Sequence, residues 1–145
     1  MNHHPLVRRA NQLKETGLYE DAADLYVQYG EMLMSEDLKH EAYVAFSQAA
    51  NCFIINSPQK AIIAYRAAIK CAVDAELWEL AATCAYTAGS SYFTTNPPPM
   101  QESDAINFFL HAADLYQSCG LVMQAQQAFQ YVSILNEKIN CSVKK

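Results

Sequence analysis

The sequence predicts an all-α fold, a right-handed array of antiparallel helical hairpins containing about seven helices. The chain of 145 residues holds only 4 glycines and 22 alanines, a bias that favours long helices over sheets and turns. A pattern of small and aromatic residues recurs along the chain at helical spacing. The prolines, together with Gly17 and Gly120, fall at places where one helix is expected to stop or the next to begin. Together these three observations indicate a helical repeat.

The recurring pattern starts with Gly17, Tyr19, Ala22 and Tyr26, at offsets 0, 2, 5 and 9. It resembles the second-helix signature of a tetratricopeptide repeat. A core of small residue, aromatic residue and alanine, at spacings of four and three, recurs twice more, as Ala61, Tyr65, Ala68 and as Ala105, Phe109, Ala112. Residues so spaced share one helical face, where alanine lets a neighbouring helix approach and the ring fills the groove beside it. We therefore expect stacked helical hairpins.

The predicted helices cover residues 5–15, 19–34, 36–55, 58–73, 76–94, 101–118 and 121–139. We expect one repeat domain over residues 1–145, made of hairpin units at about 5–34, 36–73 and 76–118 and a final helix at 121–139. Ser57–Pro58 predicts an N-cap followed by a proline at the first helical position. The run 96–99 reads Asn-Pro-Pro-Pro and predicts a stiff extended loop.

Further signals mark helix ends. Gly120 is expected where the sixth helix stops. The acidic pairs Glu20–Asp21 and Glu36–Asp37 are expected at helix starts, where carboxylates complement the helix macrodipole.

Composition excludes several classes of function. The net charge is −5, with 10 Lys and Arg against 15 Asp and Glu, which argues against nucleic-acid binding. The four glycines are too scattered for a dinucleotide or phosphate loop. The N-terminal residues do not resemble a secretory signal, and the longest apolar run, 52–55, is far too short to span a bilayer. Five cysteines, none in a CxxC pair, predict buried reduced thiols of a cytoplasmic protein.

No catalytic or metal-binding pattern is present in the sequence. His40–Glu41 is an isolated pair without the second histidine of HExxH, and His111 lies between apolar neighbours. Cys84 has no neighbouring histidine and falls on an alanine-rich helical face, which favours core packing over a nucleophile. We therefore expect a protein without enzymatic activity, metal or cofactor.

Two runs with an alanine-aromatic rhythm carry a more specific resemblance: residues 41–53, EAYVAFSQAANCF, and residues 104–116, DAINFFLHAADLY. Together with the pairs Ala61–Ile62 and Ala67–Ala68, the long period and the insertion before Asp104, they resemble the soluble attachment proteins (SNAPs) that dock the N-ethylmaleimide-sensitive fusion ATPase onto SNARE complexes. The resemblance covers roughly residues 17–135.

This resemblance implies a non-enzymatic adaptor in vesicle fusion and intracellular transport. Family members present a twisted helical sheet that grips the SNARE four-helix bundle largely through charge, and a carboxy-terminal bundle contacts the fusion ATPase. The SNARE bundle and this ATPase are therefore the implied partners, with at most peripheral membrane association. One departure stands out. Family members tend to carry basic residues where the third unit begins, whereas Asp74, Glu76 and Glu79 are acidic.

Four residues are candidates for partner contact. Lys60, Arg66 and Lys70 fall on adjacent turns of one predicted helix and suggest a basic strip, for which a solvated helix face is the alternative. Trp78, near a helix start, suggests a binding anchor, for which packing against the preceding helix is the alternative. We expect the contact surface to be formed by the first helices of the hairpins.

Two other functions stay open at this stage. A generic tetratricopeptide-like scaffold or peptide-binding module would share the fold, but clustered Lys, Arg and Asn for an acidic tail are not obvious. The last helix, apolar on one side and covered by glutamines on the other, could instead form a homodimer, with Phe129 and Leu135 as contact residues.

Overall fold

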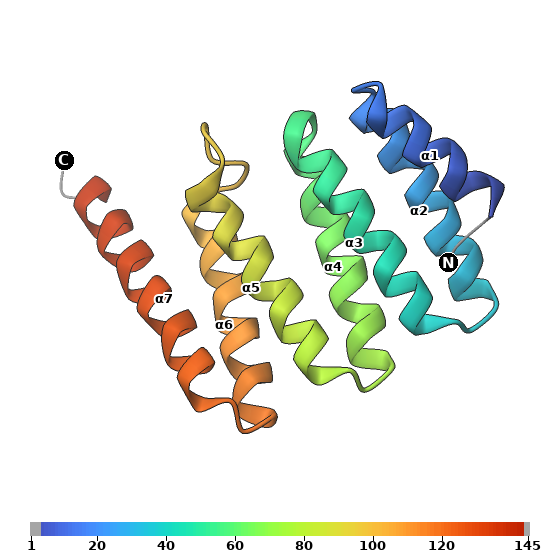
Figure 1. The fold of residues 1–145 in the computed structure, drawn as a ribbon. Helices are drawn as coiled ribbons and strands as arrows, with labels where there is room; N and C mark the ends of the chain where they lie inside the picture. The colour runs from blue at the N-terminus through green and yellow to red at the C-terminus, as the bar shows by residue number, and fades with distance from the viewer. Residues whose placement is uncertain (1–3, 144–145) are drawn as a thin grey trace. The chain divides into compact units, whose positions relative to one another are not determined.

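The fold is all-α, as the sequence predicts (Figure 1). A computed structural model describes residues 4–143 of the chain, and this part contains helices and no strand. Seven helices follow one another along it: α1 (Pro5–Glu15), α2 (Tyr19–Ser35), α3 (Lys39–Asn56), α4 (Pro58–Asp74), α5 (Trp78–Thr94), α6 (Glu102–Ser118) and α7 (Val122–Val143). The predicted number of helices and the absence of a sheet in the described residues are confirmed.

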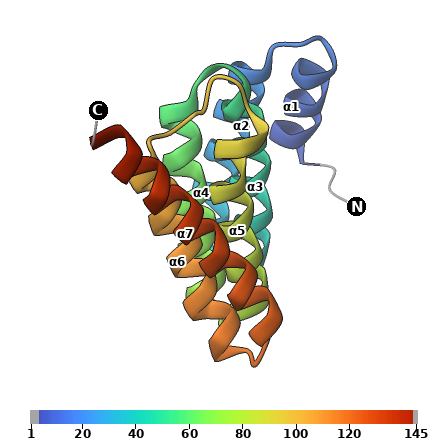
Figure 2. The same ribbon diagram turned by 90° about the vertical axis from the view of Figure 1, so that its left-hand side faces the viewer.

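The helices form two compact units, which we describe separately: residues 1–76 and residues 77–145. In the first unit α1 packs on α2, α2 on α3 and α3 on α4. In the second unit α5 packs on α6 and α6 on α7. Neighbouring helices within a unit run antiparallel (Figure 1), and α7 lies over α6 with its outer side toward the viewer in Figure 2. The expectation of a single domain over the whole chain stays a prediction.

Alanine against aromatic side chains is the main packing pattern of both units. The motif alanines predicted to face a neighbouring helix, Ala22, Ala61 and Ala105, have no exposed surface, and Phe109 of the third motif has none either. Methyl groups let two helix axes approach closely, and a ring from the neighbouring helix then fills the remaining space. The predicted helical face is therefore the face that is buried.

Two glycines continue this pattern at the closest helix contacts. A Cβ atom on Gly89 of α5 would lie 2.9 Å from Cδ2 and Cε2 of Phe109 on α6. A Cβ atom on Gly30 of α2 would lie 2.9 Å from Cζ of Phe46 on α3. The two sites differ, because Gly30 meets the tip of its ring whereas Gly89 also meets the ring root, with Cγ of Phe109 at 3.1 Å.

Four of the connections between helices use the same turn. The second residue after the helix has a positive φ and a leucine follows it: Gly17 (84°), Asp37 (61°), Glu76 (60°) and Gly120 (78°). At three of them the leucine N–H donates to a carbonyl five residues earlier: Leu18 to Leu13, Leu38 to Leu33 and Leu121 to Tyr116, at 2.8–2.9 Å. This bond is the 6→1 bond of the Schellman motif, which satisfies carbonyls at the end of the helix.

The repeated turn corrects two predicted helix starts. We expected helices to begin at residues 36 and 76, but α3 begins at Lys39 and α5 at Trp78. Glu36–Asp37 therefore ends α2 instead of opening α3. The acidic residues had been interpreted as partners of a helix N-terminus. The left-handed conformation usually calls for glycine, so Asp37 and Glu76 in the same role gave no recognisable signal.

The remaining boundaries agree with the sequence more closely. α4 begins at Pro58 as predicted, but the Ser57 side chain makes no capping hydrogen bond to the helix. The loop before α6 contains the proline run, and Pro99 and Met100 within it are buried. The last helix continues to Val143 instead of ending near 139, because no glycine or proline interrupts it.

We predict that Glu76→Gly stabilises the chain by about 0.5–1 kcal/mol. A left-handed conformation costs a non-glycine residue about 1–2 kcal/mol, and part of the gain is offset because glycine makes the unfolded chain more flexible. Urea denaturation followed by circular dichroism measures the change. The matched control is Glu79→Gly, another exposed glutamate but inside α5, which should cost about 1 kcal/mol. A shift of the same sign for both variants would contradict the prediction.

We also predict that Gly89→Ala is more destabilising than Gly30→Ala. Overpacking against the root of the buried Phe109 ring costs about 1–3 kcal/mol, while alanine regains about 1 kcal/mol of helix propensity. The expected net loss is up to about 2 kcal/mol for Gly89→Ala. It is close to zero for Gly30→Ala, whose ring tip can move aside. Urea denaturation of both variants measures the two changes in stability. Equal effects would contradict the prediction, because they would show that the Phe109 ring can move aside as easily as the Phe46 ring.

Candidate functional site

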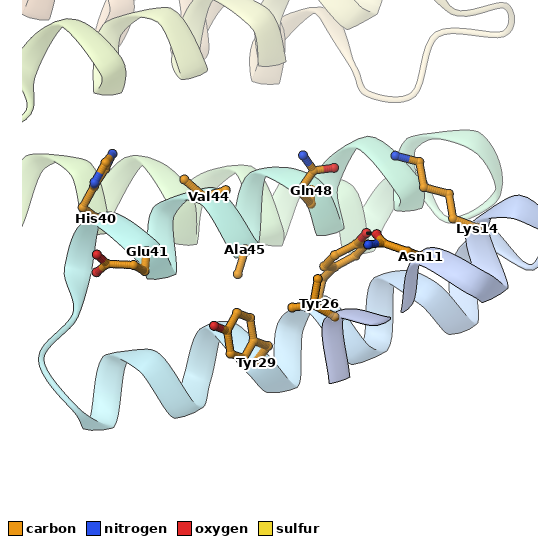
Figure 3. A pocket seen from close by; sticks show the side chains of 10 residues that line it. Asn11, Lys14, Tyr26, Tyr29, His40, Glu41, Val44, Ala45 and Gln48 are labelled. Carbon is orange, nitrogen blue, oxygen red and sulfur yellow. Dashed lines mark hydrogen bonds between the residues drawn. The ribbon is translucent and has the colours of Figure 1, made fainter. Parts of the chain in front are cut away.

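A groove between α1 and α3 in the first unit has a volume of about 460 Å³ (Figure 3). Tyr26 and Tyr29 of α2 lie at its floor, and the exposed Val44 of α3 contributes an apolar wall. The two ends carry different charges: Lys14 of α1 lies at one end, and His40 and Glu41 of α3 lie at the other (Figure 3).

The floor of this α1–α3 groove is held by one polar contact. The Tyr26 hydroxyl donates a hydrogen bond to Oδ1 of Asn11, which joins α2 to α1. Burial raises the pKa of Tyr26, so the phenol stays protonated at neutral pH. The groove therefore offers an amide, a phenol and charged ends for non-covalent binding of a polar ligand.

A second groove in the same unit runs between α2 and α4, with Phe46 and Phe53 of α3 among its lining residues and a volume of about 320 Å³. We call it the α2–α4 groove. Its α2 wall contains Asp24, Val27 and Glu31, and its α4 wall contains Lys60, Ile63, Ala64 and Ala67. Ile63 is 67% exposed, the highest value among the large hydrophobic residues described in this unit.

One ion pair joins the two walls at the start of both helices. Nζ of Lys60 lies 2.7 Å from Oε1 of Glu20, and both side chains are about half exposed. The hydrogen bond and charge of Lys60 hold the pKa of Glu20 below its ordinary value, and Glu20 in turn raises the pKa of Lys60. Because solvent screens an exposed pair, it adds little stability and serves mainly to fix the position of Lys60.

The structure places the four candidate contact residues in two different environments. Lys60, Arg66 and Lys70 are exposed on α4, the helix on which the sequence placed them and the second of its hairpin. Lys60 faces α2, and its Nζ also lies 5.7 Å from the centre of the Phe53 ring. Trp78 is the first residue of α5 in the second unit and is 41% exposed, so its ring is only partly packed.

Comparison with protein-family models gives one finding that covers most of the chain. The model of the soluble NSF attachment protein, SNAP, matches residues 5–140. The chain belongs to the SNAP family. A comparison with curated individual proteins gives no match.

In this SNAP-family chain, the second unit is held by an aromatic cluster that joins α5, α6 and α7. The ring of Phe109 on α6 stacks on Tyr131 of α7 with centroids 5.0 Å apart, and Tyr86 and Phe93 of α5 lie 5.5 and 6.4 Å from Phe109. Such pairs add about 0.5–1.5 kcal/mol each beyond their buried area. The repeat pattern predicted a packing role for Phe109 but not for Tyr131, because a ring contributed by the next helix leaves no local signal in the sequence.

The outer side of α7 is the other surface of interest in the second unit. Met123 is 74% exposed, Ile134 50% and Phe129 37%. Leu135, which we expected to be a dimer contact beside Phe129, is fully buried and cannot contact a partner. A homodimer through α7 would therefore use apolar residues that remain on the surface, among them Val122, Met123, Phe129 and Ile134.

The cysteines and the possible metal ligands of the described residues were the remaining candidates for a chemical site in this SNAP-family chain. Burial raises the pKa of the Cys52 and Cys71 thiols, so both are poor nucleophiles. Cys52, Cys71 and Cys84 are buried as predicted, but Cys119 is half-buried and Cys141 exposed. No group of three His, Cys, Asp or Glu side chains in this part of the chain could hold a metal ion. None of its helices combines the length and apolar character needed to span a bilayer.

We predict that Lys60→Gln returns the pKa of Glu20 upward toward its ordinary value near 4.5, measured by carboxyl NMR titration. Because the pKa of Glu20 is lowered in the folded chain, the pair stabilises the fold above the unfolded pKa, and this contribution is lost as pH falls through the folded value. The stability difference between wild type and variant should therefore vanish in acid. Lys39→Gln, which removes the partner of Asp37, is the control and should leave Glu20 unchanged.

Proposed function

We propose that this chain is a non-enzymatic adaptor that binds SNARE helical bundles in vesicle fusion and intracellular transport. The single observation that carries the proposal is the match of the SNAP family model to residues 5–140. The structure is compatible with such a role, since it presents rigid helical surfaces with exposed charged side chains, which suit recognition of an elongated helical partner. We further propose the fusion ATPase as a second partner and a cytoplasmic location, with at most peripheral contact to membranes.

For the contact surface we propose the basic strip of α4, with Trp78 of the second unit as an additional anchor. Arg66 and Lys70 are four residues apart and share one exposed face of α4. Lys60 lies six residues before Arg66, and its ammonium is engaged by Glu20. In this proposal Arg66 and Lys70 carry the main electrostatic attraction because they share one exposed face, and Lys60 borders the same surface.

The test is binding of the chain to an assembled SNARE four-helix bundle, compared with unassembled SNAREs, at low and at moderate salt. We expect binding that prefers the assembled bundle and weakens as salt rises, because exposed charges are screened within about 10 Å at 0.1 M salt. The variant Arg66→Glu/Lys70→Glu should bind at least tenfold more weakly. Arg8→Glu/Arg9→Glu, which changes the net charge equally on the exposed side of α1, is the matched control and should retain binding.

Two results would contradict the proposal. Equal losses in both double variants would mean that net charge alone matters and that the α4 strip is not the contact surface. If the chain does not bind the bundle at low or at moderate salt, it shares the fold of the SNAP family but not the proposed SNARE binding. The alternative function, a peptide-binding module, would then be favoured, with the α1–α3 groove and its oppositely charged ends as the candidate surface.

A further inference from the structure

We propose that the α2–α4 groove is a docking site for a single amphipathic helix whose apolar seam is flanked by basic residues on one side and acidic residues on the other. The partner is thus one helical protein segment of defined charge pattern, distinct from an assembled bundle. The inference goes beyond the proposed function and stands without it, because its test uses no SNARE protein.

The two walls of the groove carry opposite charges in a regular order. On α2, Glu20, Asp24, Val27 and Glu31 follow one another at spacings of four, three and four, so they share one face of the helix. On α4, Lys60, Ile63, Ala67 and Lys70 follow at spacings of three, four and three and also share a face. Each face has a charge at both ends, with acids on α2 and bases on α4. Between the ends, α2 carries Asp24 and Val27, and α4 carries Ile63 and Ala67.

The middle of the groove is apolar. Val27 and Ile63 lie on opposite walls, and the buried rings of Phe46 and Phe53 from α3 line the groove with them. Burying Ile63 would remove its 67% exposed side chain from water, which is the main favourable term for an apolar ligand. The stretch from Asp24 to Glu31 spans about 10 Å, or two helical turns, at 1.5 Å per residue. A ligand helix would therefore place seam residues at positions i, i+3 or i+4, and i+7 in the groove.

The opposite charges of the walls select the flanks of this helix. A flank of lysines beside α2 would meet Asp24 and Glu31. A flank of glutamates beside α4 would meet Lys60, whose exposed pair with Glu20 adds little stability and can be exchanged for the ligand. A helix with the same charge on both flanks is attracted by one wall of the groove and repelled by the other. Exchanging the two flanks does not abolish the match, because the helix can then lie in the opposite direction. The charge pattern therefore also fixes the direction of the bound helix.

A second copy of this chain is a less suitable occupant. A two-fold contact could pair the acidic wall of one copy with the basic wall of the other. However, two grooves that face each other leave their hollows unfilled, whereas a single helix is convex and can bury Ile63 and Val27. The shape of the surface, together with its charge, favours a lone helix.

The test measures binding of three fluorescent 18-residue helical peptides to the full chain by fluorescence anisotropy at low salt. All three have the same leucine seam. One carries lysines on one flank and glutamates on the other, the second carries only lysines, and the third only glutamates. Circular dichroism establishes equal helicity. We expect the mixed peptide to bind at least tenfold more tightly than either of the others.

Two variants locate the binding. Ile63→Glu should weaken the mixed peptide at least tenfold, whereas Ile55→Glu, a matched control at an exposed isoleucine of α3 outside the groove, should not change it. Asp24→Lys/Glu31→Lys makes both walls basic and should transfer the preference to the glutamate peptide. This second variant changes only exposed side chains and keeps the test valid if Ile63→Glu folds poorly.

The proposal is overturned by any of three results: no peptide binds, all three bind equally, or Ile63→Glu and Ile55→Glu behave alike. Analytical sedimentation, which measures self-association of the chain, provides a fourth test of the proposal. If the chain self-associates and Ile63→Glu abolishes the association, the occupant is a second copy and the proposed helix is wrong. Loss of SNARE bundle binding in separate experiments would not affect any of these outcomes.

Discussion

The close approach of helices through alanine is the constraint on which the rest of this structure depends. Ala22, Ala61 and Ala105 have no exposed surface, and at Gly89 even a methyl group would collide with the Phe109 ring. Because such contacts leave no spare volume, each helix has few positions in which its ring fits the next helix. The two grooves of the first unit follow from this packing, since α2 and α3 supply their floors through side chains set between neighbouring helices.

The connecting turns fix which face of each helix enters that packing. A residue with positive φ followed by leucine ends α1, α2, α4 and α6, and at three of these turns a backbone bond to the preceding helix fixes the reversal. Within the two units the chain thus reverses in the same way at three places, which keeps the alanine faces inward. Polar side chains then face outward in regular rows, and the charged walls of α2 and α4 are the clearest example.

These outward rows connect the fold to the function. A SNAP-family chain acts, in our proposal, by contact with other helices, and helices are recognised by rows of charge beside an apolar seam. The first unit has such a surface between α2 and α4. In the second unit, α7 has no charged residue from 122 to 136, and Met123 and Ile134 are exposed there. The first suits a partner with charged flanks. The second suits an apolar contact.

The sequence by itself determined the all-α class, the seven helices and the buried faces. Helical periodicity and alanine content are local properties, so they can be recognised in one sequence without knowledge of its tertiary contacts. It also placed Lys60, Arg66 and Lys70 on one helix. Only the tertiary structure decided that Lys60 faces Glu20, that Leu135 is buried and that α3 and α5 start two or three residues late. Such features depend on residues far apart in the sequence, or on a left-handed turn at Asp37 and Glu76, and neither leaves a periodic signal.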